Sequence, residues 1–333
     1  MKSLDQSIQR LGSLKRIFSQ AQPPIHGARS LAVVSGFAVM AVLSQNAAAA
    51  DLQLKPETQA AWNEYIENAK CSMKDRLKPG GHFLWMDEDA QRSAKVKKGE
   101  IVAGPVNKET NPLPVPSGLI HHWIGAAFVP NSTIKDVFAV VNDYQRYKDI
   151  YKPSVIESKA VSRNETEGKF KLLLQSKSHF VKTAFDGDYA STDVQVDPTH
   201  WYSFSHTTNI QEIEHYGQAS QKKLPAGQGS GVIWNLFSIN RFEERDGGVY
   251  VELEALLLSR EIPNGLHWLV DPIVRRVAKS SLVTSLEQTG SAVRTQVASR
   301  KTEPGVQPPT GRPAESTVEA KGARRGSNKS GQN

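Results

Sequence analysis

The most regular pattern in the chain is an alternation of apolar and polar residues from Val249 onward. Valine, leucine and alanine occupy the odd positions, and Tyr250, Glu252 and Glu254 occupy the first even positions. A period of two predicts a β-strand with one buried face and one mostly solvated face. Because Arg245-Asp246-Gly247-Gly248 precedes this stretch, we expect it to form a hairpin with the apolar segment before it.

Seven other stretches have strand character, and turn residues separate most of them. The first opens the main domain, and the others follow Pro153 without a long helix between them. The predicted strands are Leu119–Val129, Ser154–Ser162, Gly168–Lys177, His179–Asp186, Tyr189–Val196, Trp201–Ile213, Gly231–Glu243 and Val249–Ile262.

Helical spacing of apolar residues predicts three helices, over residues 56–77, 134–147 and 264–293. The first begins with Pro56, which suits a first helical turn, and the second follows the capping residues Asn131, Ser132 and Thr133. The third is the longest and Pro272 interrupts it early. Its apolar stripe comprises Trp268, Leu269, Ile273, Val277, Leu282 and Leu286.

This order of elements predicts an α+β helix-grip fold. A curved antiparallel sheet of about seven strands is expected to wrap round the long C-terminal helix, because one sheet alone cannot bury its apolar face. The space between a curved sheet and a single helix is often too large for side chains to fill. We therefore expect an apolar ligand pocket between the two.

The first 50 residues have the layout of a secretory signal peptide. The apolar run 31–43 follows Arg29, and Ala48 and Ala50 stand in the A-x-A positions before Asp51. Thirteen residues rise only about 20 Å as a helix, so cleavage near Ala50 is favoured over an uncleaved membrane anchor. We expect a periplasmic or secreted protein. Its only cysteine, Cys71, excludes an intramolecular disulfide.

The remainder divides into three parts. Residues 51–116 are expected to be an N-terminal helical extension that packs on the main domain, residues 117–295 the main domain, and residues 296–333 a disordered tail rich in Pro, Gly and Ser. The net charge of +7 lies in the ends, because residues 51–293 carry −2. A nearly neutral body argues against nucleic acid as a partner. The basic tail suits transient contact with a membrane surface, and no pattern indicates an oligomeric state.

The element order and three stretches resemble the START-like (SRPBCC) helix-grip superfamily over residues 117–293. These stretches are Ile134–Tyr151 with the following Pro153, the strand Val249–Arg260 and the helix Leu266–Glu287. The superfamily contains sterol and phospholipid carriers, hormone binders and polyketide aromatase/cyclases. The resemblance thus implies a hydrophobic ligand and leaves open whether chemistry is performed on it.

Strand alternation and the start of the long helix indicate which residues would form the pocket. An error of one residue in register would invert any strand of this set. No cofactor or metal is expected, because no ligand spacing or cofactor motif is present. The predicted ligand-binding residues are Trp123, Leu172, Leu174, Trp234, Leu236, Val251, Leu253, Leu266, Trp268 and Leu269.

Three functions compete. The leading hypothesis is an exported carrier or sensor of a hydrophobic or lipid-like small molecule, with no catalytic residue. The second is a cyclase or aromatase-type enzyme, in which His121 or His122 would act as general base with Glu252 as its partner. Against that role, Glu252 and Glu254 are expected to form an outer charged face paired with Arg241 or Arg245. The third is a structural envelope protein whose cavity is filled by its own side chains.

Overall fold

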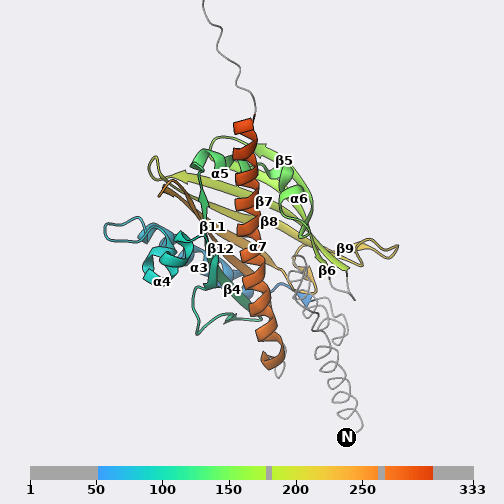
Figure 1. Ribbon diagram of the computed structural model, residues 1–333. Helices are drawn as coiled ribbons and strands as arrows, with labels where there is room; N and C mark the ends of the chain where they lie inside the picture. The colour runs from blue at the N-terminus through green and yellow to red at the C-terminus, as the bar shows by residue number, and fades with distance from the viewer. Residues whose placement is uncertain (1–51, 178–181, 262–266, 303–333) are drawn as a thin grey trace, which may run out of the picture.

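The computed structural model describes residues 52–177, 182–261 and 267–302. One ten-stranded antiparallel sheet dominates these residues, in the order β2-β4-β12-β11-β8-β7-β6-β5, with β3 and β9 pairing beside β4 and β8 (Figure 1). The predicted signal peptide lies outside the described residues, as does most of the predicted tail. The strands are β2 Val102–Pro105, β3 Leu113–Val115, β4 Gly118–Pro130, β5 Val155–Arg163, β6 Glu167–Lys177, β7 Lys182–Gln195, β8 His200–Glu214, β9 Lys222–Lys223, β11 Asn235–Arg245 and β12 Gly248–Arg260.

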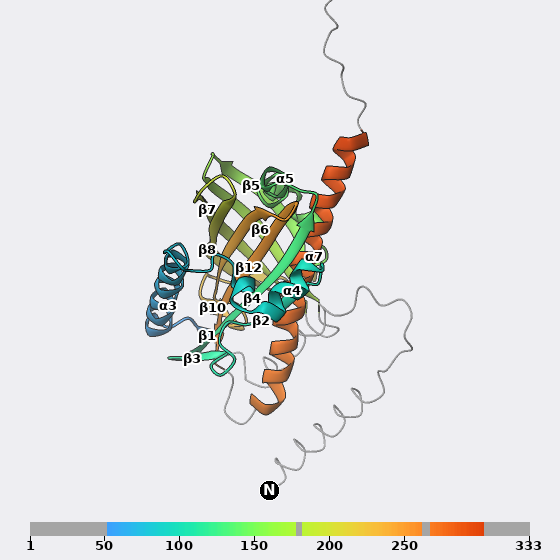
Figure 2. The same ribbon diagram turned by 60° about the vertical axis from the view of Figure 1, so that its left-hand side comes forward.

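Helices cover both faces of this sheet. Helix α7 (His267–Thr302) crosses one face, and α3 (Pro56–Asp75) lies on the other, so the sheet is the middle layer (Figure 2). We call these the helix face and the extension face. The predicted α+β helix-grip fold is therefore confirmed, and its seven long strands match the expected number. The other elements are β1 Leu52–Gln53, which pairs with β10 Gln228–Gly229, η1 Trp85–Glu88, α4 Ala90–Lys97, α5 Ile134–Val141, η2 Tyr144–Arg146 and α6 Tyr147–Ile150.

The hairpin between β11 and β12 forms as the turn residues predict. Arg245 pairs with Gly248, and the two residues between them, Asp246 and Gly247, have φ values of 55° and 74°. Positive φ at both central positions is typical of the tight turns that match the twist of a hairpin. The turn fixes the register of β12, which decides which of its side chains meets each face.

Helix α7 approaches β4 closely at Gly125. A Cβ atom on Gly125 would lie 2.9 Å from a methyl carbon of Leu286 and 3.1 Å from one of Leu282. Both leucines are buried, and Leu286 belongs to an apolar cluster with Val129, Val137 and Phe242. The absence of a side chain at Gly125 thus lets the helix lie against this edge of the sheet.

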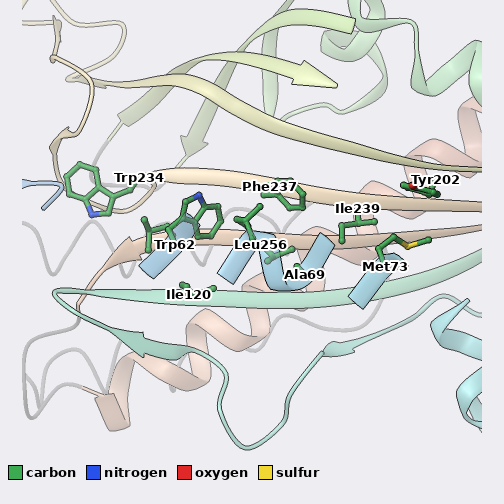
Figure 3. Close-up of a cluster of buried hydrophobic side chains, with 11 residues drawn as sticks. Trp62, Ala69, Met73, Ile120, Tyr202, Trp234, Phe237, Ile239 and Leu256 are labelled. Carbon is green, nitrogen blue, oxygen red and sulfur yellow. The ribbon is translucent and has the colours of Figure 1, made fainter. Parts of the chain in front are cut away.

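The extension face is sealed by the N-terminal extension. Trp62, Ile66, Ala69 and Met73 follow helical spacing on α3 and are buried against the sheet (Figure 3). Each fully buried large apolar side chain contributes about 1.5–3 kcal/mol, so this contact anchors the extension firmly. The strand residues of this cluster are Ile120, Tyr202, Phe237, Ile239, Leu256 and Leu258, with Trp234 just before β11.

Several boundaries differ from the sequence prediction. Residues 179–186 and 189–196 were expected as two strands, but the described residues 182–195 form one strand, β7, with a register shift between Asp188 and Tyr189. The expected helix 134–147 ends at Val141 and is followed by η2 and α6. Helix α7 continues to Thr302, past the expected end near Val293. A bulge changes the strand locally without ending it, which is why turn-like residues within β7 suggested a break.

Candidate ligand cavity

A cavity of about 430 Å³ lies between α7 and the helix face of the sheet. This volume falls within the range of small-molecule sites. Strands β6, β7, β8, β11 and β12 form its floor, and α7 with the segment around α6 forms its other walls. Its lining comprises Val141, Asn142, Tyr144, Tyr147, Tyr151, Ser154, Val155, Phe170, Leu172, Leu174, Tyr189, Ser191, Ser203, Ser205, Ile233, Leu236, Ser238, Asn240, Phe242, Val251, Leu253, Leu257, Ser281, Thr284, Ser285, Leu286, Gln288 and Thr289.

Stacked aromatic rings build one wall of the cavity. The ring of Phe170 lies between those of Tyr144 and Tyr189, with centroid distances of 4.2 Å and 5.0 Å. Tyr147 and Tyr151 continue this wall with an edge-to-face contact at 4.9 Å. Aromatic groups of this kind offer a large apolar surface together with hydroxyl groups at its margin.

The titratable side chains among the described lining residues are all tyrosines. Burial raises the pKa of Tyr144, Tyr147, Tyr151 and Tyr189 above the ordinary value for a phenol. These hydroxyl groups therefore remain neutral at physiological pH and are able to donate hydrogen bonds. The cavity wall is consequently uncharged.

Helix α7 presents small polar side chains to the cavity instead of a purely apolar stripe. Ser281, Thr284, Ser285, Gln288 and Thr289 all line the cavity. Two of them fasten the opposite wall, because the Tyr151 and Thr289 hydroxyls lie 3.0 Å apart and the Gln288 Nε2 donates to the Lys152 carbonyl at 2.6 Å. These contacts hold the segment at the end of α6 against the helix.

Five of the predicted ligand-binding residues lie in the cavity lining. Leu172, Leu174, Leu236, Val251 and Leu253 all reach it from the sheet floor. The side chains of Leu266, Trp268 and Leu269 lie outside the described residues.

Trp123 and Trp234 are not brought to the cavity. Trp123 is buried on β4, which contributes no residue to the lining, and it pairs with Pro105 at the edge of the sheet. Trp234 precedes the first residue of β11, so strand alternation does not apply to it. It packs instead into the cluster on the extension face.

His121 is buried but also lies outside the cavity lining. Its Nε2 is 2.9 Å from the Ser259 hydroxyl, and burial lowers its pKa to about 4. A histidine that stays neutral and is hydrogen-bonded within β4 and β12 stabilises the sheet. The structure thus does not place it in the cavity, where the enzyme hypothesis would need a general base.

Glu252 and Glu254 point to the extension face, as expected, but they are buried rather than solvated. Residues of η1 cover Glu252, whose carboxylate accepts hydrogen bonds from the backbone amides of Trp85 at 2.9 Å and Met86 at 2.8 Å. Arg241 is 1% exposed, and its guanidinium forms ion pairs with both carboxylates. The expected pairing with Arg241 is thus present inside the protein.

The ionisation of this pair differs between its members. Burial raises the pKa of Glu252. Burial opposes ionisation of Glu254 too, but the Arg241 charge and the hydrogen bond to His122 outweigh it and lower the pKa of Glu254 to about 2. The cluster therefore contains a firmly ionised ion pair that the protein itself satisfies.

His122 joins the same cluster and not the cavity. Its Nε2 is 2.6 Å from a Glu254 carboxylate oxygen, and its Nδ1 is 2.9 Å from the Tyr65 hydroxyl of α3. Its neighbour His121 faces α7, because successive side chains of a strand point to opposite faces. The structure therefore does not bring His121, His122 or Glu252, the residues suggested for an enzyme, into the lining of this cavity.

The sequence contains signals for cavity residues that the prediction missed. Tyr144, Tyr147 and Tyr151 have helical spacing in the stretch that carried the family resemblance. Ser238 and Asn240 are two and four residues after Leu236, so they point to the same face of the strand as this leucine, which the prediction did include. An amphipathic pattern predicts which face of a strand or helix is buried from its apolar residues. Small polar residues on that face, such as Ser238, are therefore not predicted to line a cavity.

Within the described ranges, no group of three or more His, Cys, Asp and Glu side chains is placed to hold a metal ion. In the same part of the chain, no helix combines the length and hydropathy of a membrane span.

Solved structures with a similar fold include a STAR-related lipid transfer protein, human STARD10 and an aromatase/cyclase. A STAR-related lipid transfer protein from Xanthomonas axonopodis is 17% identical, with 58% of this chain and 93% of that chain covered and a TM-score of 0.42. Human STARD10 is 9% identical, with 68% of this chain and 87% of that chain covered and a TM-score of 0.37. The Zhui aromatase/cyclase from Streptomyces sp. R1128 is 12% identical, with 54% of this chain and 96% of that chain covered and a TM-score of 0.35.

No protein-family model matches the chain, and no curated protein matches it either. The likeness to solved structures concerns the helix-grip fold. Since the identities and TM-scores are low, they assign no ligand to this chain.

Proposed function

We propose that this chain is an exported protein that binds a hydrophobic or lipid-like small molecule between its sheet and α7, as a carrier or sensor. The uncharged cavity of about 430 Å³, with its aromatic and leucine-rich walls, supports this function. Burial of apolar ligand surface there would supply roughly 25 cal/mol per Å². Export is inferred from the apolar run 31–43 and the alanines before Asp51.

The contrast between the two faces of the sheet favours binding over catalysis. The ionisable groups suitable for proton transfer, Glu252, Glu254 and His122, are already paired with one another, with Arg241 or with the protein backbone beneath the extension. The cavity offers apolar contact and neutral hydrogen-bonding groups. This combination suits retention of a ligand.

The test is native mass spectrometry of the purified full chain, followed by organic extraction and titration with the uncharged fluorophore Nile red. We expect a co-purified apolar molecule or saturable Nile red binding. Leu253→Trp places an indole in the cavity and should weaken binding at least tenfold. The matched control Val161→Trp adds the same group at a side chain that is 53% exposed on β5 and should leave binding unchanged.

An empty, folded wild-type protein that also fails to bind Nile red would contradict the proposal. Equal binding by wild type and Leu253→Trp would place the fluorophore outside this cavity. Export is tested by the mass of the protein in the periplasmic or secreted fraction, which should match a chain that begins near Asp51.

A further inference from the structure

The side chain of Tyr189 belongs to the cavity wall, and its hydroxyl is buried. Tyr189 is 8% exposed, and its hydroxyl has no hydrogen-bond partner among the described residues. Burying an unpaired hydroxyl destabilises the folded state, so such groups usually have a specific reason. The other wall phenols differ, because Tyr147 donates to the Val141 carbonyl and Tyr151 contacts Thr289.

The backbone makes room for this tyrosine. A Cβ atom on Gly187 would lie 2.7 Å from Cε2 of Tyr189 and 3.2 Å from its hydroxyl oxygen. The ring therefore lies along its own strand above a position that has no side chain. Stacking against Phe170 at an interplanar angle of 4° holds the ring in this orientation.

A row of three serines crosses the cavity floor beside Tyr189. Ser191 on β7 pairs with Ser205 on β8, and Ser205 pairs with Ser238 on β11, and all three line the cavity. Within the described part of the chain, the Ser205 and Ser238 hydroxyls form no hydrogen bond to protein. We call these residues the serine row. Together with Tyr189 it places neutral donors and acceptors where an otherwise apolar floor would be expected.

The described lining contains neither Lys, Arg nor His. The guanidinium of Arg163, which donates to the Tyr144 hydroxyl at 3.2 Å, is already paired with Asp193. A carboxylate or phosphate buried there would lack a counter-charge, which is costly in an apolar environment. An uncharged oxygen atom, by contrast, would accept a hydrogen bond from Tyr189 at little cost. The lining thus discriminates by charge as well as by polarity.

We infer that the cavity selects an uncharged, oxygen-bearing hydrophobic molecule, such as an alcohol or ketone, and that Tyr189 is a specificity-determining residue that donates a hydrogen bond to its oxygen. This inference rests on the proposed binding function. The serine row provides a second place for polar atoms of the same ligand. Fatty acids and lipids with charged headgroups are disfavoured.

The experiment compares three molecules with one carbon skeleton: farnesol, farnesene and farnesoic acid. Their affinities for the full chain are measured by displacement of Nile red at pH 7. We expect farnesol to bind about tenfold more tightly than farnesene, equivalent to about 1.4 kcal/mol, and more tightly still than farnesoic acid. Tyr189→Phe should remove most of the preference for farnesol over farnesene.

The control variant is Tyr202→Phe, which removes a phenol from the extension face. It should leave all three affinities unchanged. A second measurement needs no ligand: Tyr189→Phe should raise the melting temperature of the ligand-free protein or leave it unchanged, because no protein hydrogen bond is lost. A clear loss of stability would mean that the hydroxyl has a protein partner, and would overturn the inference.

The other outcomes separate this inference from the proposed function. Equal affinity for farnesol and farnesoic acid, or an unchanged farnesol preference in Tyr189→Phe, would overturn the selectivity while binding stands. Nile red binding without displacement by any of the three would contradict the ligand class in the same way. No binding of any of the four compounds would contradict the binding function itself.

Discussion

The two faces of the sheet differ in the polar groups that they bury and in whether the protein supplies partners for them. On the extension face, Arg241, Glu252, Glu254 and His122 are charged or ionisable, and each has protein partners. On the helix face, the cavity contains hydroxyl and amide groups, and several of its hydroxyls have no partner among the residues that the structure describes. Strand β11 contributes to both sets, with Arg241 on the extension face and Ser238 and Asn240 in the cavity, since alternate side chains point to opposite faces.

This difference separates structural from ligand-directed polarity. A buried charge must be compensated within the protein, so the extension face needs α3 and η1 to supply partners such as Tyr65 and the amides of Trp85 and Met86. Burying an unpaired neutral hydroxyl costs far less free energy than burying an unpaired charge. Such a hydroxyl is therefore tolerated without a protein partner and remains free to bind a ligand. The predictions below test this contrast.

The largest effect is expected from Arg241→Met. It leaves Glu252 and Glu254 buried without their cation, which should lower the free energy of unfolding by about 3–5 kcal/mol. Urea denaturation measures this change. Arg146→Ala is the control, because Arg146 is 62% exposed and 3.9 Å from Asp143, and it should cost less than about 0.5 kcal/mol. If Arg241→Met lowers the free energy of unfolding by less than about 1 kcal/mol, the charges on the extension face do not depend on their protein partners, and the contrast with the helix face is wrong.

A similar but pH-dependent effect is expected at His121, which is buried on the helix face outside the cavity. Its pKa is lowered from 6.5 to about 4, so the folded state binds a proton less readily than the unfolded state. The contribution of neutral His121 to the free energy of unfolding is fully present above pH 6.5 and is lost as the pH falls through about 4. The total loss is about 3 kcal/mol.

The check is urea denaturation at several pH values between 7 and 4. His121→Gln should remove most of this pH dependence, whereas His82→Gln, at an exposed position, should retain it. Identical pH profiles for wild type and His121→Gln would show that His121 is not held neutral by the fold.

A smaller effect is expected from Tyr65→Phe. This variant removes the hydrogen bond between α3 and His122, which is 2.9 Å long, and keeps the ring in place. The loss should be about 1 kcal/mol, typical of one partly buried hydrogen bond. A melting temperature equal to that of wild type would mean that the extension is held by apolar contacts alone.

The smallest effect is expected from Ser205→Ala on the helix face. The Ser205 hydroxyl has no protein partner within the described residues, so the free energy of unfolding should change by less than about 0.5 kcal/mol. Thermal unfolding without ligand provides the comparison with Tyr65→Phe. A loss as large as that of Tyr65→Phe would mean that the serine row stabilises the fold itself.

Much of the fold was predictable because it depends on local periodicity. The alternation in β12, the turn at Asp246-Gly247 and the stripe with Leu282 and Leu286 each act within a few residues. These patterns determined the hairpin, the order of elements and the helix across the sheet. They also indicated Leu172, Leu174, Leu236, Val251 and Leu253, which lie in the cavity lining.

Only the tertiary structure decided what covers each face. Alternation shows that Glu252 and Val251 point in opposite directions, but the burial of Glu252 depends on Trp85 and Met86, more than 160 residues earlier in the chain. The serine row likewise requires the register of three strands, and β7 carries a bulge beside Tyr189. Local propensity contains no information on such distant pairings. Hydrogen bonding and packing between remote segments therefore determined which polar groups became structural and which were left to the cavity.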